Sequence, residues 1–337
     1  MTNAIVAEGL IRRFGSTVAL DGLDLTVREG TVTGLLGPNG AGKTTTVRVL
    51  STLLRADSGR AVVAGLDVRT DAVRLRGRIG LSGQYAAVDD DLTARENLTM
   101  IGRLYHLGAA ASVKRADELL ERFDLTEDAD RLVKGYSGGM RRRVDLACAV
   151  VSKPEVLFLD EPTTGLDVRS RIGMWEVIDE LVRGGSTLLL TTQYLEEADQ
   201  LADRIAVVDH GRVIAEGTSD ELKARIGGER LELTVASAAE VSTARMLLRE
   251  IAQGVITVDE EHNRVIVPVD DGPQALVTGI RLLDDAHVRL VGADLRKPSL
   301  DEVFLALTAR PIPVLDAADE RGHTVGTVSA KTKEKIK

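Results

Sequence analysis

The sequence predicts an α/β fold for the first two thirds of the chain and a smaller α+β domain after it. A glycine-rich phosphate-binding pattern at residues 37–45 lies between an apolar strand and an amphipathic helix. Beyond a glycine pair at 227–228 the expected elements follow the order βαββαβ. At 337 residues the chain exceeds the usual size of one core. We therefore expect two domains, 1–226 and 227–310, and a disordered tail at 311–337.

Composition and charge narrow the functional class. The chain has 44% hydrophobic residues, 3% aromatic residues and a net charge of -9, so neither base stacking nor a global basic field favours nucleic acid. The single cysteine, Cys148, permits no internal disulfide and indicates a reducing compartment. No apolar run approaches the ~20 residues of a membrane span, and the N-terminus does not resemble a signal peptide. Any membrane role is expected to come through a partner.

Residues 37–45 read GPNGAGKTT and match the phosphate-loop template G-x-x-x-x-G-K-[ST]. Glycines let successive backbone N–H groups point inward, and the following helix adds the positive end of its dipole. Lys43 would reach the β- and γ-phosphates of ATP, and Thr44 would ligate Mg²⁺. The candidate nucleotide-binding residues of this loop are Gly37, Pro38, Asn39, Gly40, Ala41, Gly42, Lys43, Thr44 and Thr45.

Short strands are expected on both sides of this loop. Residues 5–8, 17–20 and 23–27 read as strands, with turn signals at 14–15 and 21–22. Phe14 follows the first of these strands, and its ring could stack on a purine or simply cap the edge of a sheet. Gln84 leaves a strand pair at 61–84, where its amide could reach Mg²⁺ or the attacking water, or could be an ordinary loop residue.

Helical periodicity replaces the strands after residue 92. A helix at 112–123 is the clearest member of a helical subdomain expected at about 86–150. Near its end, residues 136–140 read YSGGM, where Ser137 is a good helix cap and Gly138 and Gly139 permit close backbone approach. This pattern favours a second anion-binding helix start, although a plain capped turn fits it as well.

Carboxylates end the next apolar strand. Residues 156–160 (VLFLD) bring Asp160 to the carboxyl end of a buried strand, where a ligand for Mg²⁺ or its water is needed. Glu161 follows directly and could act as general base toward the attacking water. Another buried strand, 186–192, delivers Gln193. The domain is expected to end with an acidic helix, a strand pair turning at His210-Gly211 and a helix at 219–225.

The C-terminal segment predicts a split ferredoxin-like domain without a catalytic constellation. A final amphipathic helix at 299–308 begins with the capping box of Ser299 and Glu302. Regulation or simple packing against the larger domain are both open roles for this segment. Its expected strands and helices are 231–235, 239–251, 255–258, 265–269, 274–283 and 287–293.

The order of these motifs along residues 4–225 resembles the ATP-binding subunits of ABC transporters, which have a P-loop NTPase core. In that family two subunits sandwich two ATP molecules, so the resemblance implies a dimer with a second copy of the chain. The resemblance assigns Phe14 to adenine stacking, Gln84 to the Q-loop, Ser137, Gly138 and Gly139 to the signature, Asp160 and Glu161 to Walker B, and Asp167 to the D-loop at the dimer interface.

Two positions depart from the family pattern. The signature, usually LSGGQ, is YSGGM here, so Tyr136 and Met140 replace a leucine and a glutamine while the serine and glycines remain. The switch histidine is replaced by Gln193. A glutamine amide can donate a hydrogen bond to the γ-phosphate but cannot carry a proton charge. We therefore predict slow but real ATP hydrolysis, with Gln193 as a catalytic candidate.

Gln193 and the stretches 83–93 and 296–308 resemble a narrower branch, the daunorubicin/doxorubicin-resistance ATPases. This resemblance implies a subunit that powers efflux of amphipathic, anthracycline-like drugs or lipids through a separate polytopic ABC-2-type permease. Its location would be peripheral, at the cytoplasmic face of the cell membrane. The alternative is a soluble ABC-type ATPase acting on ribosomes or DNA. A single ATPase unit, the acidic balance and a spacing of only 53 positions from Gln84 to Ser137 count against it.

Overall fold

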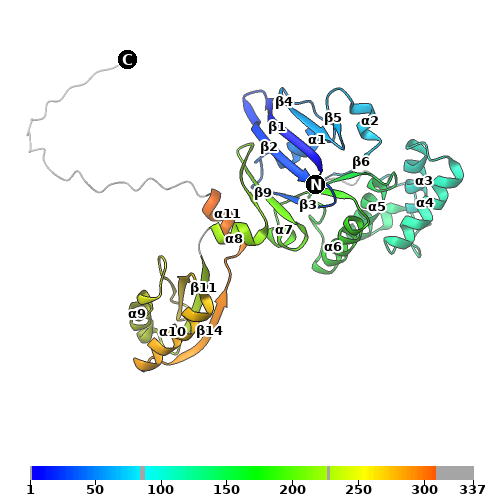
Figure 1. Cartoon of the computed structure of the whole chain (residues 1–337). Helices are drawn as coiled ribbons and strands as arrows, with labels where there is room; N and C mark the ends of the chain where they lie inside the picture. Colours follow the sequence, from blue (N-terminus) through cyan, green and yellow to red (C-terminus); the bar gives the residue numbers. More distant parts are fainter. Residues whose placement is uncertain (1, 84–87, 226–227, 309–337) are drawn as a thin grey trace, which may run out of the picture.

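The computed structural model describes residues 2–83, 88–225 and 228–308, which form three sheets and their covering helices (Figure 1). Two sheets belong to the large domain and one to the C-terminal domain. The described part of the chain contains no helix long and apolar enough to cross a membrane. The predicted tail at 311–337 lies outside the described residues.

The first sheet is antiparallel and corrects the predicted N-terminal strands. Residues expected as short separate strands form two 12-residue strands, and the turn predicted at Asp21-Gly22 lies inside the second. There the pairing shifts register opposite Leu10 and Ile11, and Gly22 has φ 78°. The bulge keeps Leu20 and Leu23 both buried, so pairing overrides the local turn signal. The strand order is β2 (Thr17–Arg28), β1 (Asn3–Phe14), β4 (Ser58–Val63), β5 (Leu66–Asp67).

The central sheet has five parallel strands and one antiparallel edge strand. Alternate residues of its buried strands serve two cores: Leu157 and Leu159 face the helical side, and Phe158 faces the first sheet. The hairpin predicted at His210-Gly211 is confirmed, since Arg212 pairs with Asp209. The strand order is β10 (Arg212–Gly217), β9 (Arg204–Asp209), β3 (Val32–Leu36), β8 (Thr187–Thr192), β7 (Val156–Asp160), β6 (Ile79–Ser82).

Helices surround this sheet. The predicted helical subdomain is built on the pair α3 and α4, whose apolar faces bury Leu98, Leu119 and Phe123. Thr93 and Glu96 form a capping box that begins α3. The helices and the short 3-10 turn of the large domain are α1 (Lys43–Leu50), α2 (Ala72–Arg76), α3 (Ala94–Leu104), α4 (Ala109–Arg122), η1 (Val133–Gly135), α5 (Gly138–Ala149), α6 (Val168–Arg183), α7 (Leu195–Leu201) and α8 (Ser219–Arg225).

The C-terminal domain has the predicted βαββαβ order. Its four strands are antiparallel in the order β12-β13-β11-β14, and Leu231, Leu233 and Val267 point into a separate core. Its elements are β11 (Glu229–Val235), α9 (Ala238–Leu247), η2 (Leu248–Glu250), β12 (Thr257–Asp259), β13 (Arg264–Val269), α10 (Gly272–Asp285) and β14 (Leu290–Arg296).

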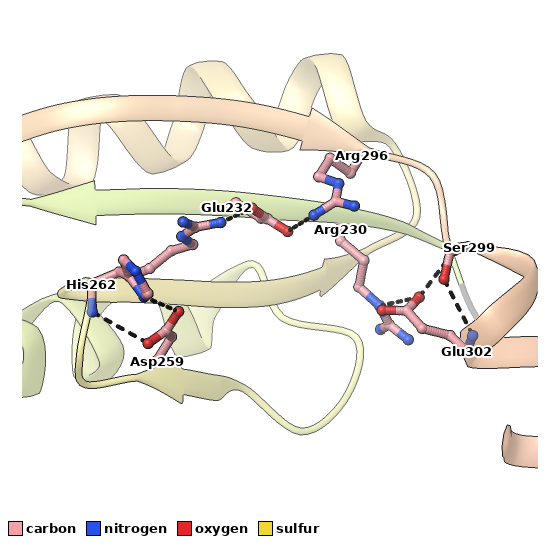
Figure 2. A network of polar contacts seen from close by, with 8 residues as sticks. Arg230, Glu232, Asp259, His262, Arg296, Ser299 and Glu302 are labelled. Atoms are coloured by element: carbon pink, nitrogen blue, oxygen red, sulfur yellow. Dashed lines mark hydrogen bonds and ion pairs between the residues drawn. The ribbon is translucent and has the colours of Figure 1, made fainter. Parts of the chain in front are cut away.

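A charged network crosses this sheet (Figure 2). Glu232 on β11 is only 8% exposed and accepts from Arg264 on β13 at 2.9 Å and from Arg296 on β14 at 3.0 Å. Three neighbouring strands are thereby joined by one carboxylate. Two arginines on one buried carboxylate satisfy its acceptors, and both guanidinium groups keep contact with solvent.

The last helix, α11 (Leu300–Thr308), packs its apolar side chains against the large domain, while Glu302 forms an ion pair with Arg230 of β11 at 4.0 Å. Leu300 and Val303 share a core with Ala198 of α7 and Leu222 of α8. The predicted capping box is confirmed, because Ser299 N donates to Glu302 and Glu302 N donates to Ser299 Oγ at 3.2 Å (Figure 2). The chain thus leaves the large domain, forms the C-terminal domain and returns.

Candidate nucleotide-binding site

Backbone geometry at the loop after β3 demands glycine at two predicted positions. A Cβ on Gly37 would lie 2.3 Å from the carbonyl oxygen of Val208. Gly42 has φ 111°, and a Cβ there would lie 2.6 Å from the carbonyl oxygen of Ala19. The β3 loop therefore folds tightly against neighbouring strands before α1 begins, which presents its backbone N–H groups as an anion cradle.

Lys43 holds the loop closed from within. Its Nζ donates to the carbonyl oxygens of Gly37 at 2.7 Å and Pro38 at 3.1 Å, and the residue is 5% exposed. Burial lowers the pKa of Lys43, and the nearby carboxylates of Glu161 and Asp160 oppose that shift. A cationic amine held at this loop can bind phosphate oxygens as a point charge.

Asp160, at the end of β7, accepts hydrogen bonds from hydroxyl groups on two other elements. Its Oδ1 accepts from Thr44 Oγ1 at 3.1 Å and from Thr191 Oγ1 of β8 at 2.5 Å. A hydroxyl and a carboxylate beside a phosphate loop are hard oxygen donors of the kind that Mg²⁺ binds together with water and phosphate. The residues present therefore fit a magnesium ion.

Glu161 begins the turn after β7 with φ 53°, an uncommon backbone conformation for this residue type. Its N–H donates to the carbonyl oxygen of Thr191 at 3.0 Å, and its Oε2 accepts from Thr164 Oγ1 at 3.3 Å. The side chain is half-buried. Strain that surrounding contacts maintain is typical of functional positions, and Glu161 lies within electrostatic range of Lys43.

Arg142, on α5, supports this turn and was missed by the sequence reasoning. Its guanidinium is buried and donates to the carbonyl oxygens of Pro162 at 2.8 Å and Gly83 at 2.6 Å. It also donates to the carbonyls of Asp160 and Glu161 at 3.3 Å and forms an ion pair with Asp145. Burial lowers the pKa of Arg142, while Asp145 opposes that shift. The available signal was an arginine three residues before an aspartate that stands alone in the apolar second half of the helix.

Glu197, on α7, is a second residue that the sequence reasoning missed. It is fully buried, and its Oε1 accepts from Thr163 Oγ1 at 2.8 Å and Trp175 Nε1 at 3.2 Å. Burial raises the pKa of Glu197, and its hydrogen bonds act in the opposite direction. Glu197 joins the segment after Glu161 to the helix that follows Gln193.

Ser137 caps the N-terminus of α5 as predicted, and its Oγ accepts from Met140 N at 3.2 Å. Gly139 lies against Ser170 of α6, where an added Cβ would come within 2.8 Å of the hydroxyl. Ser170 in turn donates to Asp167 from both its N–H and its hydroxyl at 2.9 Å. These hydrogen bonds lower the pKa of Asp167. The structure thus brings the predicted signature and D-loop side by side.

The two unusual signature residues have packing roles. The Tyr136 hydroxyl donates to the carbonyl oxygen of Asp128 at 2.5 Å, and its ring is buried. Met140 packs against the helical-side core. Neither contact disturbs Ser137 or the glycines.

Three further candidates differ in how far the structure describes them. Phe14 ends β1, is 47% exposed and has the guanidinium of Arg12 4.8 Å from its ring centroid. Gln193 follows β8 and is exposed. Gln84 lies outside the described residues, whereas Gly83 before it is anchored by Arg142.

Together the phosphate loop, the strand-end carboxylates and the helical subdomain define an ATPase of the ATP-binding cassette class. Residues 20–164 match the family model described as ABC transporter, and residues 217–308 match that of the ATP-binding protein DrrA1-3-like, C-terminal domain. A solved ATP-binding subunit of an ABC transporter superimposes with a TM-score of 0.60 at 26% identity, covering 66% of this chain and 93% of that chain. A nucleotide-free ATP-binding cassette gives 0.59 at 28% identity, covering 65% and 93%.

Full-length relatives narrow the class. The chain is 58% identical to the daunorubicin resistance ATP-binding protein DrrA2 of Streptomyces coeruleorubidus, covering 90% of this chain and 95% of that protein. It is 49% identical to the daunorubicin/doxorubicin resistance ATP-binding protein DrrA of Streptomyces peucetius, covering 99% and 98%. The chain belongs to this family of ABC transporter ATP-binding proteins. It is an ATPase and binds ATP, and the alternative of a soluble ABC-type ATPase is not favoured.

Proposed function

We propose that this chain powers export of amphipathic, anthracycline-like drugs or lipids through a separate polytopic ABC-2-type permease. The observation that carries the proposal is the assembly of Lys43, Thr44, Asp160 and Glu161 around one loop in a chain whose relatives are named for drug resistance and for Nod factor export. Those relatives include a linearmycin resistance protein of Bacillus subtilis at 34% identity, covering 91% of this chain and 98% of that protein.

Each site residue has a role in this proposal. The loop N–H groups and Lys43 bind the phosphates, while Phe14 stacks on the base. Thr44, Asp160 and Gln84 hold Mg²⁺, which when bound neutralises charge on the β- and γ-phosphates. Glu161 accepts a proton from the attacking water, and Gln193 donates a hydrogen bond to the γ-phosphate. The full set of nucleotide contacts is Phe14, the loop residues 37–45, and Ser137, Gly138 and Gly139.

A second copy of the chain completes the site in the proposed dimer. Ser137 presents a helix N-terminus, which binds anions, on a surface that Gly138 keeps free of side-chain bulk. Among the described residues no hydrogen bond or ion pair joins this helix start to the phosphate loop of the same chain. This supports contact with the nucleotide held by the other copy, with Asp167 at the interface.

A groove of about 270 Å³ is the proposed permease contact. It lies between the end of α1, strand β6 and helices α3 and α5, and Leu53, Ile101 and Tyr105 are among the side chains that line it. Leu53 is 64% exposed and Tyr105 36%. Exposed apolar surface of this kind marks protein contacts, so a short permease helix fits it. The protein would thus be peripheral at the cytoplasmic membrane face, with no nucleic-acid partner.

The proposal is tested by affinity purification of tagged Glu161→Gln protein with ATP from detergent-solubilised membranes of its native host. This variant keeps the phosphate contacts but lacks the base, so the closed dimer should accumulate with its permease. The matched control is Lys43→Ala, whose dimer should not close because the variant lacks the phosphate-binding amine. Recovery of a polytopic membrane protein with Glu161→Gln supports the proposal. Recovery of ribosomal proteins, or of the ATPase alone, contradicts it.

A further inference from the structure

The segment 48–78 has a charge opposite to that of the whole chain. It carries seven arginines and three aspartates and contains no lysine, glutamate or histidine, which gives it a net charge of +4 in a chain of net charge -9. All seven arginines are exposed. A local reversal of charge of this size is a signature of binding to an anionic surface.

The acidic residues of this segment are already engaged. Asp57 pairs with Arg12 at 2.8 Å, Asp71 with Arg74 at 3.1 Å, and Asp67 faces Arg60 at 3.9 Å while accepting two backbone N–H groups. In the described part of the chain, no carboxylate lies within ion-pair distance of Arg48, Arg55, Arg69 or Arg76; the exposed Arg78 faces Glu155. The surplus positive charge is therefore available to a partner.

Two of the unpaired arginines share a cavity. Arg55 and Arg69 line a space of about 450 Å³ between the loop before β4 and the loop after β5, together with Arg60 and Thr70. The carbonyl of Arg48 accepts from Leu54 N at 2.9 Å, which holds the end of α1 beside Arg55. Arginine guanidinium groups bind phosphate in a bidentate manner, so this arrangement can cradle a phosphodiester.

Exposed apolar side chains accompany these arginines. Val73 on α2 is 83% exposed and Leu53 is 64% exposed. Arg76 Nε donates to Thr52 Oγ1 at 2.9 Å, which ties α2 to the end of α1, and Arg76 and Leu53 both line the proposed permease groove. Figure 1 shows α2, β4 and β5 at the end of the molecule away from the C-terminal domain. Arginines around small exposed apolar residues match the interface of an anionic bilayer.

We propose that the arginine surface, defined as Arg48, Arg55, Arg69 and Arg74 with Val73, binds anionic phospholipid headgroups directly. This inference rests on the proposed function only for the direction in which the surface faces, because the adjoining groove would hold the permease. Direct lipid contact would orient the ATPase at the membrane and add to the affinity that the permease alone supplies.

The test is flotation of the purified full-length protein with permease-free vesicles. Vesicles of phosphatidylglycerol and phosphatidylcholine should bind the protein, and vesicles of phosphatidylcholine alone should not. Binding should weaken steeply with salt, because the Debye length falls from about 10 Å at 0.1 M to about 3 Å at 1 M. Each arginine near an anionic surface raises the affinity for the membrane about fivefold. Arg48→Gln/Arg55→Gln/Arg69→Gln should therefore weaken binding on the order of a hundredfold.

The matched control replaces the exposed Arg245, Arg249 and Arg281 of the C-terminal domain by Gln, which makes the same change in net charge. It should retain most of the binding. Val73→Asp is a second variant, at an exposed position, and it should bind anionic vesicles less tightly than the parent.

Equal binding to both kinds of vesicle, or equal loss of binding in both triple variants, overturns the proposal. Stronger binding of duplex DNA than of anionic vesicles would assign the surface to nucleic acid and overturn the lipid assignment. Because the vesicles hold no permease, these outcomes do not depend on the purification experiment.

Discussion

Arg142 Nε donates a hydrogen bond of 2.8 Å to the backbone carbonyl oxygen of Pro162. Through this bond the helix that begins with the signature serine is fixed to the turn that holds Glu161. The same guanidinium reaches the carbonyl of Gly83, directly before Gln84. One buried side chain therefore sets the relative positions of three motifs that lie far apart in the sequence.

Replacing Arg142 by Met should lower the free energy of unfolding by about 1–3 kcal/mol, since buried carbonyls lose their donor. ATP hydrolysis should fall by between about tenfold and a hundredfold, because Glu161 loses its fixed position. ATP binding should change less, since the phosphate loop keeps its own contacts. Denaturant unfolding and steady-state kinetics measure these effects.

The control Arg141→Met removes only an exposed ion pair with Asp90 and should shift the free energy of unfolding by no more than about 0.5 kcal/mol. A similar loss in both variants would contradict the role of Arg142.

Much of this arrangement is predictable from local pattern, and part of it is not. The phosphate loop, the strand ending in Asp160 and the βαββαβ order follow from motif and periodicity. The strand break expected at Asp21-Gly22 was wrong, because pairing with β1 absorbs the glycine in a bulge. Arg142 and Glu197 escaped notice because charged residues on helices are usually solvated. Their burial depends on partners more than 15 residues away along the chain, which no local window contains.

The buried carboxyl of Glu197 should make the free energy of unfolding depend on pH. Burial raises the pKa of this carboxyl above its ordinary value of 4.5, so the native state holds the proton more tightly than the unfolded state. Stability is favoured below pH 4.5 and is lost as pH rises from there through the raised native pKa. The free energy of unfolding of the parent should therefore decline with pH relative to Glu197→Gln. Trp175, the single tryptophan and a donor to Glu197, reports unfolding by fluorescence.

The control for this pH series is Glu196→Gln, which alters the exposed neighbouring carboxylate. Its difference from the parent should stay nearly constant across the same pH range. A flat difference for Glu197→Gln as well would show that the buried carboxyl does not titrate differently in the native state.

Cys148 should be inert in the native protein. Burial, with a smaller effect of Asp145, raises the pKa of its thiol to about 12, so very little thiolate exists near pH 8. A thiol-reactive dye should label the chain much more slowly in buffer than in denaturant, with a small-molecule thiol as the rate standard. Labelling at the same rate in both conditions would contradict the burial of Cys148 on α5.

Gln193 should affect turnover more than affinity. It follows Thr191 and Thr192 at the end of β8, and Thr191 is the residue that positions both Asp160 and the Glu161 backbone. An amide at this place can stabilise charge that develops on the γ-phosphate, and loss of one such donor costs about a hundredfold to a thousandfold in kcat. Gln193→Ala should therefore lower kcat markedly, while Gln193→His should change kcat because an imidazole can also carry the proton. Affinity for ATP should stay within about threefold in both, because these variants remove an interaction made in the transition state. Steady-state hydrolysis and nucleotide titration separate the two quantities, and Gln200→Ala on the exposed face of α7 is the matched control. If Gln193→Ala hydrolyses ATP as fast as the parent, the side chain has no part in catalysis.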